Sequence, residues 1–310
     1  MITQTLILTA GLILLFVGSS LLVEGAASTA IMFAVRPVIV GLTIVSFATS
    51  APELLVSLVA AVKGSGGISI GNILGSNVIN IALVLGVSAV IRPVTIKKQI
   101  IKIEIPYMIL ISCIFWLLCM DSKIGKLDGF ILIFLLIVFL VYGVITAKDK
   151  NSDNNLVKPS FVAIFKNIIF ITLGIVMLAY GANFVVQEAI IIAQKIGLSQ
   201  TFIGISVVAF GTSLPELATS AVAAAKGESD ISVGNVVGSN LFNICLVMGI
   251  VGIFNPMSID SNLHFFQFPF MLFICFFLGF VAFVNHGIGK KHGFLFIILF
   301  FVYIFISYLN

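Results

Sequence analysis

The chain has 310 residues, of which 60% are hydrophobic and only 9% are charged. A soluble globular domain carries about 25% charged residues, so 16 basic and 12 acidic groups are too few to cover a soluble fold of this size. The composition excludes a soluble protein and predicts one that crosses a membrane several times. The net charge of +4 arises from lysines and arginines in short segments between apolar runs, which indicates topology and predicts no nucleic-acid partner.

The apolar runs are continuous and long enough to cross about 30 Å of hydrocarbon as helices. Barrel strands would alternate polar and apolar residues instead. Ten spans are predicted, at 4–23, 37–61, 68–91, 100–119, 127–147, 161–182, 200–224, 231–254, 265–285 and 291–309. The longest polar connector, at 146–160, divides them into two blocks of five.

The two blocks contain an internal repeat. A shift of 163 residues aligns 47–86 with 210–249 without a gap, and 24 of these 40 positions are identical. Because each block has an odd number of spans, two similar blocks must lie in the bilayer with opposite orientations. The predicted fold is an all-α membrane protein of ten transmembrane helices in two inverted five-helix repeats, at 1–147 and 161–310, joined by a linker at 148–160. This architecture is typical of secondary transporters, whose site lies near the midplane where the repeats meet.

The positive-inside rule predicts the orientation. With the N-terminus outside, twelve basic residues fall on the inner side: Arg36, Arg92, Lys97, Lys98, Lys102, Lys148, Lys150, Lys158, Lys166, Lys226, Lys290 and Lys291. Four remain outside: Lys63, Lys123, Lys126 and Lys195. We therefore expect a multi-pass protein of the cell membrane, with both termini extracytoplasmic and the loop at 148–160 in the cytoplasm.

Two carboxylates, Glu53 and Glu216, lie well inside predicted spans and at equivalent positions of the repeat. Burying a carboxylate in a membrane costs several kcal/mol unless it is paired, protonated or metal-bound. No lysine or arginine lies in the central parts of these spans. An external cation is therefore the expected partner, and a hydrogen-bonded carboxylate pair between helices is the alternative.

Spacing predicts which other side chains share the faces of these carboxylates. Ser46, Thr49, Glu53 and Ser57 form one helical stripe, and Ala209, Thr212, Glu216 and Ser220 repeat its spacing. Ser76 with Asn80, and Ser239 with Asn243, share a face on the spans that follow. Carboxylate, hydroxyl and amide oxygens without histidine or thiolate suit a hard cation such as calcium or sodium. For Ser57 and Ser220, a packing role between helices is expected instead.

Proline and glycine add to the pattern. Pro52 and Pro215 each precede a buried glutamate, so the helix should be kinked or unwound beside the carboxylate. Glycines at 71, 75, 234 and 238 have the small-xxx-small spacing that permits close helix packing. The asparagines at 72, 77, 235 and 240 are expected to point to other faces and to form interhelical hydrogen bonds.

Paired motifs in the two halves carry a family resemblance. ATSAPE (48–53) and GTSLPE (211–216), with GNILGSNVIN (71–80) and GNVVGSNLFN (234–243), resemble the two alpha repeats of the calcium/cation antiporter superfamily. These motifs lie within alpha-1 (41–86) and alpha-2 (204–249), and the whole chain resembles the prokaryotic sodium/calcium exchangers of that superfamily.

The resemblance implies a function and a set of metal ligands. Helices 2, 3, 7 and 8 would enclose sites where calcium and sodium compete, while helices 1 and 6 slide to change access. The implied ligands are the side chains of Glu53, Glu216, Ser76, Ser239, Asn80 and Asn243, side-chain or backbone oxygens of Thr49, Thr212, Ser50 and Ser213, and the backbone carbonyls of Ser46 and Ala209. Ala48 replaces a usual glycine, and Asn243 stands where some relatives have aspartate, so the site offers two negative charges, enough to neutralise one calcium ion.

The expected function is sodium/calcium antiport by alternating access, with a proton/calcium exchanger of the same fold as the alternative. A channel is disfavoured by the inverted repeats and kinks. An enzyme is disfavoured because the three histidines, His264, His286 and His292, lie near span ends or in a loop, where none is placed as a base for a serine nucleophile. The four cysteines lie in apolar runs without CxxC spacing, so no zinc site is predicted. We expect no cofactor and no obligatory protein partner, only the two ions and the lipid bilayer.

Overall fold

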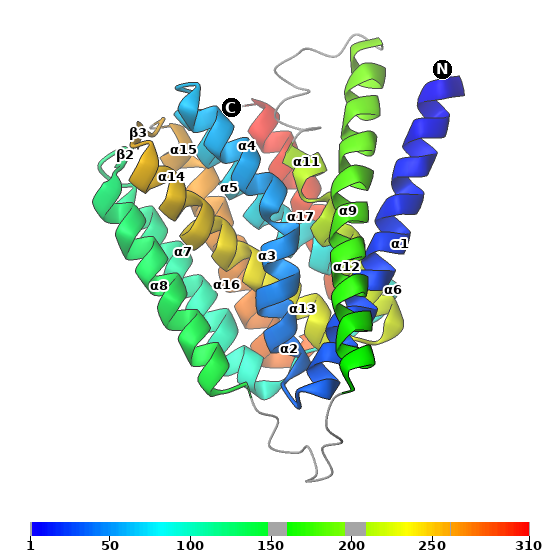
Figure 1. Ribbon diagram of the computed structural model, residues 1–310. Helices are drawn as coiled ribbons and strands as arrows, with labels where there is room; N and C mark the ends of the chain where they lie inside the picture. Colours follow the sequence, from blue (N-terminus) through cyan, green and yellow to red (C-terminus); the bar gives the residue numbers. More distant parts are fainter. Residues whose placement is uncertain (1, 148–159, 196–208, 261, 310) are drawn as a thin grey trace.

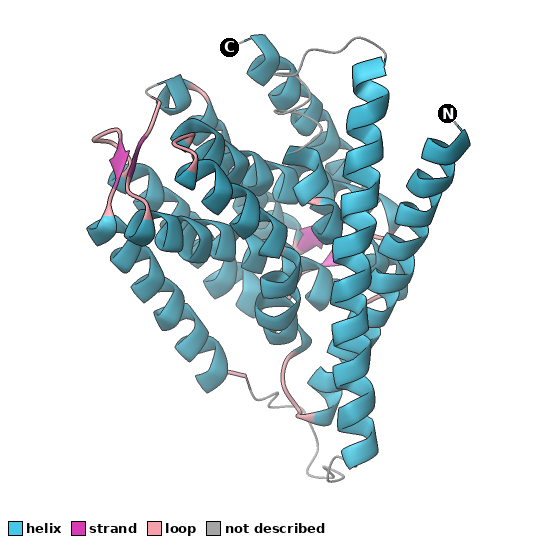
Figure 2. Ribbon diagram, turned by 45° about the horizontal axis from the view of Figure 1, so that its top comes forward, coloured by secondary structure: helices cyan, strands magenta, loops and turns pink. Residues whose placement is uncertain are grey.

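The computed structural model describes residues 2–147, 160–195, 209–260 and 262–309, which are almost entirely helical (Figures 1 and 2). The first half contains α1 (Ile2–Met32), α2 (Pro37–Val40), η1 (Gly41–Val45), α3 (Ser46–Thr49), α4 (Ala51–Val62), α5 (Gly66–Ile79), η2 (Asn80–Leu85), α6 (Gly86–Ile91), β1 (Val94–Thr95), η3 (Ile100–Glu104), α7 (Ile105–Leu118), β2 (Lys123–Ile124) and α8 (Lys126–Ile145). The second contains α9 (Phe161–Lys195), α11 (Ala209–Thr212), α12 (Leu214–Lys226), α13 (Ser229–Leu241), η5 (Phe242–Val247), α14 (Met248–Phe254), β3 (Met257–Ser258), α15 (Asn262–Phe265), α16 (Gln267–Asn285), β4 (Gly287–Ile288) and α17 (Lys290–Leu309). The segments labelled η are π-helical.

The helices are those of a predominantly helical membrane protein. In the described ranges, eight helical runs are long and apolar enough to cross a bilayer, and a ninth is the pair Pro37–Thr49 and Ala51–Val62, bent by 44°. The predicted span at 200–224 falls partly on residues 196–208, outside the described residues, so the count of ten stays a prediction. Two helices are longer than the predicted spans at 4–23 and 161–182: α1 continues to Met32 and α9 to Lys195.

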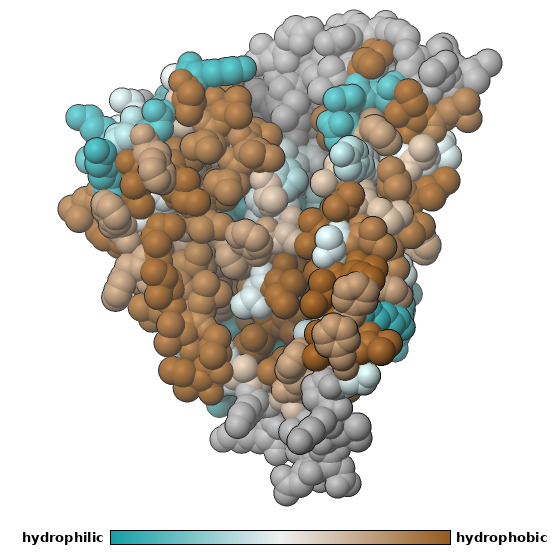
Figure 3. Space-filling model, viewed as in Figure 1, coloured by the Kyte–Doolittle hydropathy of each residue, from teal (hydrophilic) through white to brown (hydrophobic). Residues whose placement is uncertain are grey.

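Two runs form the centre of the molecule. In the apolar 18-residue window of Gly66–Ile91, 89% of the residues are buried, and in that of Ser229–Phe254, 83%. In the outer run Phe161–Glu188 the share is only 17%. Apart from their apolar residues, α5 and α13 consist mainly of glycine, serine and asparagine. Small residues such as glycine and serine permit close helix packing. Figure 3 shows hydrophobic side chains over the middle of the face that it draws, as expected where lipid replaces water.

Helices α1 and α9 lie side by side and run in opposite directions (Figure 1). A Cβ atom on Gly11 would lie 3.0 Å from the carbonyl oxygen of Gly181, and one on Gly18 would lie 2.9 Å from that of Gly174. The shift of 163 matches Gly11 with Gly174 and Gly18 with Gly181, so equivalent helices cross antiparallel at equivalent glycines. This supports the predicted inversion for the first span of each half.

Two short antiparallel ladders join the halves. β1 pairs with β4 through Val94 and Ile288, and β2 pairs with β3 through Ile124 and Met257. β1 and β3 are equivalent under the shift, so each half gives one strand to each ladder. The start of α1 and the end of α17 lie at one end of the molecule, and the end of α8 and the start of α9 lie at the other (Figure 1).

Glycine packing differs between the two alpha motifs. A Cβ atom on Gly234 would lie 2.7 Å from the carbonyl oxygen of Val38, and one on Gly238 would lie 2.8 Å from Cα of Leu42. The predicted packing role is therefore confirmed for α13, which lies directly on η1 and α2. The equivalent neighbours of Gly71 and Gly75 fall within 201–205, outside the described residues, so their role stays a prediction.

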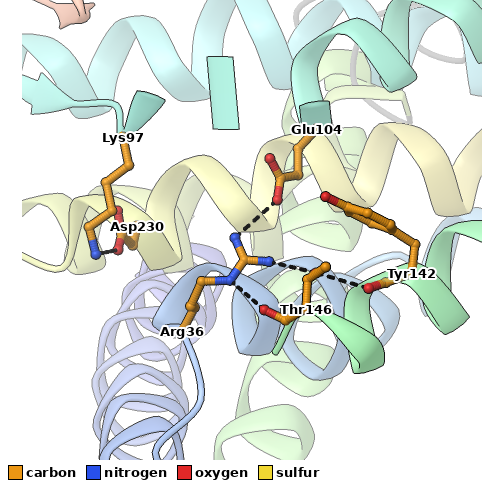
Figure 4. A network of polar contacts seen from close by, with 6 residues as sticks. All are labelled: Arg36, Lys97, Glu104, Tyr142, Thr146 and Asp230. Atoms are coloured by element: carbon orange, nitrogen blue, oxygen red, sulfur yellow. Dashed lines mark hydrogen bonds and ion pairs between the residues drawn. The ribbon is translucent and has the colours of Figure 1, made fainter. Parts of the chain in front are cut away.

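A polar network holds the loop after α1 against the rest of the first half (Figure 4). Arg36 forms an ion pair with Glu104 at 3.2 Å and donates hydrogen bonds to the carbonyl and hydroxyl oxygens of Thr146, both at 3.0 Å. Lys97 forms an ion pair with Asp230 at 2.5 Å and so joins the two halves. The Arg36–Glu104 pair is buried and is the stronger constraint.

We expect Gly129→Ala on α8 to lower the free energy of unfolding by about 1–3 kcal/mol, because overpacking forces the backbone to shift. A Cβ atom there would lie 2.5 Å from the carbonyl oxygen of Gly249. Gly143→Ala on the same helix is the matched control, since its nearest described neighbour would be Ile39 at 3.9 Å, an ordinary contact. Denaturant unfolding in detergent micelles measures both, and equal stability of the two variants would contradict the packing.

Candidate functional site

Two helix breaks place the buried glutamates. Ser50 separates α3 from α4, and Ser213 separates α11 from α12, each with ψ near 5° in place of the helical value. Pro52 and Pro215 occupy the first turn of the following helix, where a missing N–H costs least. The kink predicted beside each carboxylate is confirmed. Glu53 and Glu216 lie in the first turns of α4 and α12, where the helix dipole favours negative charge.

The two carboxylates are joined by reciprocal contacts between the halves. Both are fully buried. Ser213 donates from Oγ to Oε1 of Glu53 at 3.3 Å, and Ser50 donates from Oγ to Oε1 of Glu216 at 3.4 Å. Since each serine immediately precedes the helix that carries the other carboxylate, Glu53 and Glu216 share one polar region. Ser76 adds a third hydroxyl, 3.4 Å from Oε1 of Glu53.

The predicted threonines bridge the halves as well. Thr49 Oγ1 lies 3.1 Å from Oδ1 of Asn235 and 3.3 Å from Oγ of Ser239. Thr212 Oγ1 lies 3.4 Å from Oδ1 of Asn72, which repeats the Thr49–Asn235 contact with the halves exchanged. Both threonines therefore face the opposite half.

Four buried side-chain oxygens of this region have no hydrogen-bond partner: Glu53 Oε2, Glu216 Oε2, Asn80 Oδ1 and Asn243 Oδ1. They form two equivalent pairs, and each half contributes one carboxylate and one amide. A buried acceptor without a partner costs about 1–3 kcal/mol, and more when it is charged. Carboxylate and amide oxygens of this kind are the ligand types that hard cations prefer.

Among the described residues, no lysine or arginine side chain forms an ion pair with Glu53 or Glu216. The ion pairs of that part of the chain are Arg36–Glu104, Lys97–Asp230 and Lys166–Glu24, and all lie away from Glu53 and Glu216. In the same ranges, no group of three or more histidine, cysteine, aspartate or glutamate side chains is placed to hold a metal. A cation here would meet two carboxylates and neutral oxygens.

Ser46 and Ala209 are the weakest of the predicted set. The Ser46 carbonyl accepts the Ser50 N–H at 2.9 Å, so one of its lone pairs is engaged within the helix. The Thr49 hydroxyl lies 3.3 Å from this carbonyl but closer, at 3.1 Å, to the acceptor Oδ1 of Asn235. The Ser46 hydroxyl lies 2.7 Å from the Gly41 carbonyl oxygen and 2.9 Å from the Asn235 carbonyl oxygen. Ala209 is the first residue of α11, and the role of its carbonyl stays a prediction.

Four asparagines do more than the sequence predicted. Asn72 and Asn235 donate to Ser57 and Ser220 at 3.0 and 2.9 Å, which confirms interhelical hydrogen bonding and the packing role of these serines. Asn77 and Asn240 also form the interhelical hydrogen bonds that were expected, and they contact two candidate ligands in doing so. Their side-chain oxygens accept the amide N–H groups of Asn243 and Asn80, both at 3.1 Å. The spacing held a signal, since each lies three residues before a candidate ligand of its own half.

Burial alone does not single out Glu53 and Glu216, because Glu104 and Glu188 are also buried, at 1% and 7% exposure. The sequence reasoning did not identify either. Glu104 is neutralised by Arg36. An unpartnered Oε2 does not distinguish the central pair either, because Glu104 and Glu188 each have one as well. What distinguishes Glu53 and Glu216 is that each accepts a hydrogen bond from a serine hydroxyl of the opposite half.

Comparison with known proteins places these features in a family. The model of the family described as "Sodium/calcium exchanger protein" matches residues 3–144 and again 166–309, once in each half. The chain is 33% identical over 282 residues to the inner membrane protein YrbG of Escherichia coli, covering 88% of this chain and 87% of that one. It is 30% identical over 321 residues to the sodium/calcium exchanger MaX1 of Methanosarcina acetivorans, covering 91% of each.

A solved structure has the same fold. The sodium-calcium exchanger NCX_Mj, soaked with 10 mM Na⁺ and zero Ca²⁺, matches with a TM-score of 0.87 and 31% identity, covering 97% of each chain. A second structure of NCX_Mj, soaked with 2.5 mM Na⁺ and 0.1 mM Ca²⁺, matches with a TM-score of 0.85 and the same coverage.

Proposed function

We propose that this chain, which belongs to the sodium/calcium exchanger family, exchanges Na⁺ for Ca²⁺ across the membrane at the buried oxygen cluster between its halves. The observation that carries the proposal is the set of four unpartnered oxygens on Glu53, Glu216, Asn80 and Asn243. The family's members are exchangers and not enzymes, in agreement with the expectation from the sequence.

The charge of the site suits calcium. Glu53 and Glu216 together supply two negative charges, which would neutralise one divalent cation, and no lysine or arginine of the described ranges pairs with either carboxylate. Calcium takes six to eight oxygen ligands in flexible geometry. The unpartnered oxygens would supply four, and the neighbouring hydroxyls would complete the shell: those of Ser50, Ser76, Ser213, Ser239, Thr49 and Thr212.

The same oxygens suit sodium once calcium has left. Sodium is also a hard cation, and the hydroxyls at 49, 50, 212 and 213 offer additional neutral ligands. We therefore propose that Na⁺ and Ca²⁺ compete for one cluster and that only loaded states change access. An inward sodium gradient would then drive calcium out of the cell. The backbone carbonyls of Ser46 and Ala209 would complete two outer sodium sites.

Two inverted repeats would provide the alternating access. The antiparallel crossing of α1 and α9 at equivalent glycines supports this arrangement. We propose that these two helices slide across the central ones, that both termini face outward, and that the loop at 148–160 faces the cytoplasm. The common position of the two chain ends supports their lying on one side of the membrane, and the distribution of basic residues supports that side being the outer one.

Calcium uptake into proteoliposomes tests the proposal. Vesicles loaded with Na⁺ and diluted into Na⁺-free buffer containing ⁴⁵Ca²⁺ should accumulate calcium. Collapsing the Na⁺ gradient with a sodium ionophore should stop uptake, and a protonophore should leave it unchanged. Uptake that follows a pH gradient and ignores Na⁺ would identify a proton/calcium exchanger instead, and an absence of uptake under both gradients would contradict calcium antiport altogether.

A further inference from the structure

Four asparagines where α5 crosses α13 form a closed set of hydrogen bonds, here called the asparagine quartet: Asn77, Asn80, Asn240 and Asn243. Asn80 Nδ2 donates to Oδ1 of Asn240, and Asn243 Nδ2 donates to Oδ1 of Asn77, both at 3.1 Å. Each bond joins the two halves, and all four side chains are fully buried.

The orientation of the quartet is set by the main chain. Asn77 Nδ2 donates to the carbonyl oxygen of Asn240 at 3.5 Å, and Asn240 Nδ2 donates to that of Asn77 at 3.4 Å. A main-chain carbonyl can only accept, so it directs the NH₂ group of each amide toward itself. The Oδ1 atoms of Asn77 and Asn240 are thereby directed toward the other two members.

This orientation then passes to the candidate ligands. If the amide of Asn243 turned over, its Oδ1 would face the Oδ1 of Asn77, and two acceptors would meet without a hydrogen between them. The same holds for Asn80 against Asn240. The N–H groups of Asn80 and Asn243 are therefore held within the quartet, and their oxygens are the atoms left without a partner.

We propose that Asn77 and Asn240 are positioning residues that hold the amide oxygens of Asn243 and Asn80 toward the cation. The proposal rests on the proposed function. Without its partner, an amide would turn freely and present NH₂ to the cation for part of the time. Because each positioning residue acts on a ligand of the opposite half, the quartet also ties the geometry of the two amide ligands to the crossing of α5 and α13.

Calcium titration by calorimetry tests the proposal on the purified protein in detergent without Na⁺. Asn77→Leu and Asn240→Leu should each weaken calcium binding about 10–100-fold, as is typical when a partner of a metal ligand is removed. Asn167→Leu is the matched control. Asn167 is also a buried asparagine, but it donates to Thr29 at 3.3 Å, away from the site, so its loss should leave calcium affinity unchanged.

A double-mutant cycle separates positioning from packing. If Asn77 acts through Asn243, Asn77→Leu should weaken binding no further in an Asn243→Leu background, whereas Asn240→Leu should still weaken it by its full factor. If Asn77 only packed, Asn77→Leu would weaken binding by the same factor in the unaltered protein and in the Asn243→Leu background, and this result would overturn the proposal. Alanine at 77 and 240 repeats the cycle with a smaller side chain where the leucine variants do not fold.

The outcomes distinguish this inference from the proposed function. If the unaltered protein binds no calcium, the proposed function is wrong. If it binds calcium and Asn77→Leu and Asn240→Leu bind it equally well, the proposed function stands and the positioning role is wrong.

Discussion

Glu53→Gln and Glu216→Gln should each reduce sodium-driven calcium uptake at least about 100-fold. Removing one partner of a buried set of charges costs about 3–5 kcal/mol, and each 1.4 kcal/mol is a factor of ten in affinity. The glutamine keeps the size of the side chain, but one remaining negative charge cannot neutralise a divalent cation in a buried site. Uptake of ⁴⁵Ca²⁺ by proteoliposomes under an outward Na⁺ gradient gives the measurement.

The matched control is Glu24→Gln, the same chemical change on a carboxylate of α1 that is 54% exposed. It should leave uptake close to that of the unaltered protein. The midpoint of thermal unfolding without calcium should also stay the same or rise in Glu53→Gln and Glu216→Gln, because the change removes a buried charge. Near-normal uptake by either of these two variants would show that its carboxylate is not a ligand.

Arg36→Met should lower the free energy of unfolding by about 3–5 kcal/mol, because it leaves Glu104 buried without a counter-charge. The side chains of Arg36 and Glu104 are 11% and 2% exposed, so water does little to screen the pair. Oε2 of Glu104 is already buried without a partner, so the loss of Arg36 would leave both oxygens of the carboxylate without one. Denaturant unfolding in detergent micelles measures the change.

A double variant, Arg36→Met with Glu104→Leu, should recover most of the lost stability, since apolar replacements of a buried ion pair are often neutral or stabilising. Lys166→Met is the control, because its pair with Glu24 is exposed and 3.8 Å long and should contribute about 0–1 kcal/mol. If Arg36→Met proves as stable as Lys166→Met, the network of Figure 4 does not hold the loop after α1 in place.

Much of the site could be predicted because the membrane makes certain residues conspicuous. Glu53 and Glu216 stand out as charges in long apolar runs, and Pro52 and Pro215 mark helix breaks that depend on local backbone chemistry alone. The internal repeat then places each of these residues at two equivalent positions, which strengthens the prediction. Local spacing was also enough to assign packing roles to Ser57 and Ser220.

Contacts between distant segments could not be predicted in the same way. Asn77 and Asn243 are separated by 166 residues and Arg36 and Glu104 by 68, and no periodicity within one helix reveals either contact. Arg36 was interpreted only as a topology signal, although it neutralises a buried carboxylate. The sequence identifies which polar and charged residues are unfavourable to bury, but only the packed structure shows which partner stabilises each of them.

The most direct measurement of the central claim is anomalous diffraction from crystals soaked in Sr²⁺ or Ca²⁺. The account predicts an anomalous peak between Glu53 and Glu216, within coordinating distance of both carboxylates and of the side-chain oxygens of Asn80 and Asn243. A peak bound elsewhere, or a map in which the two carboxylates are too far apart to hold a common ion, would contradict it.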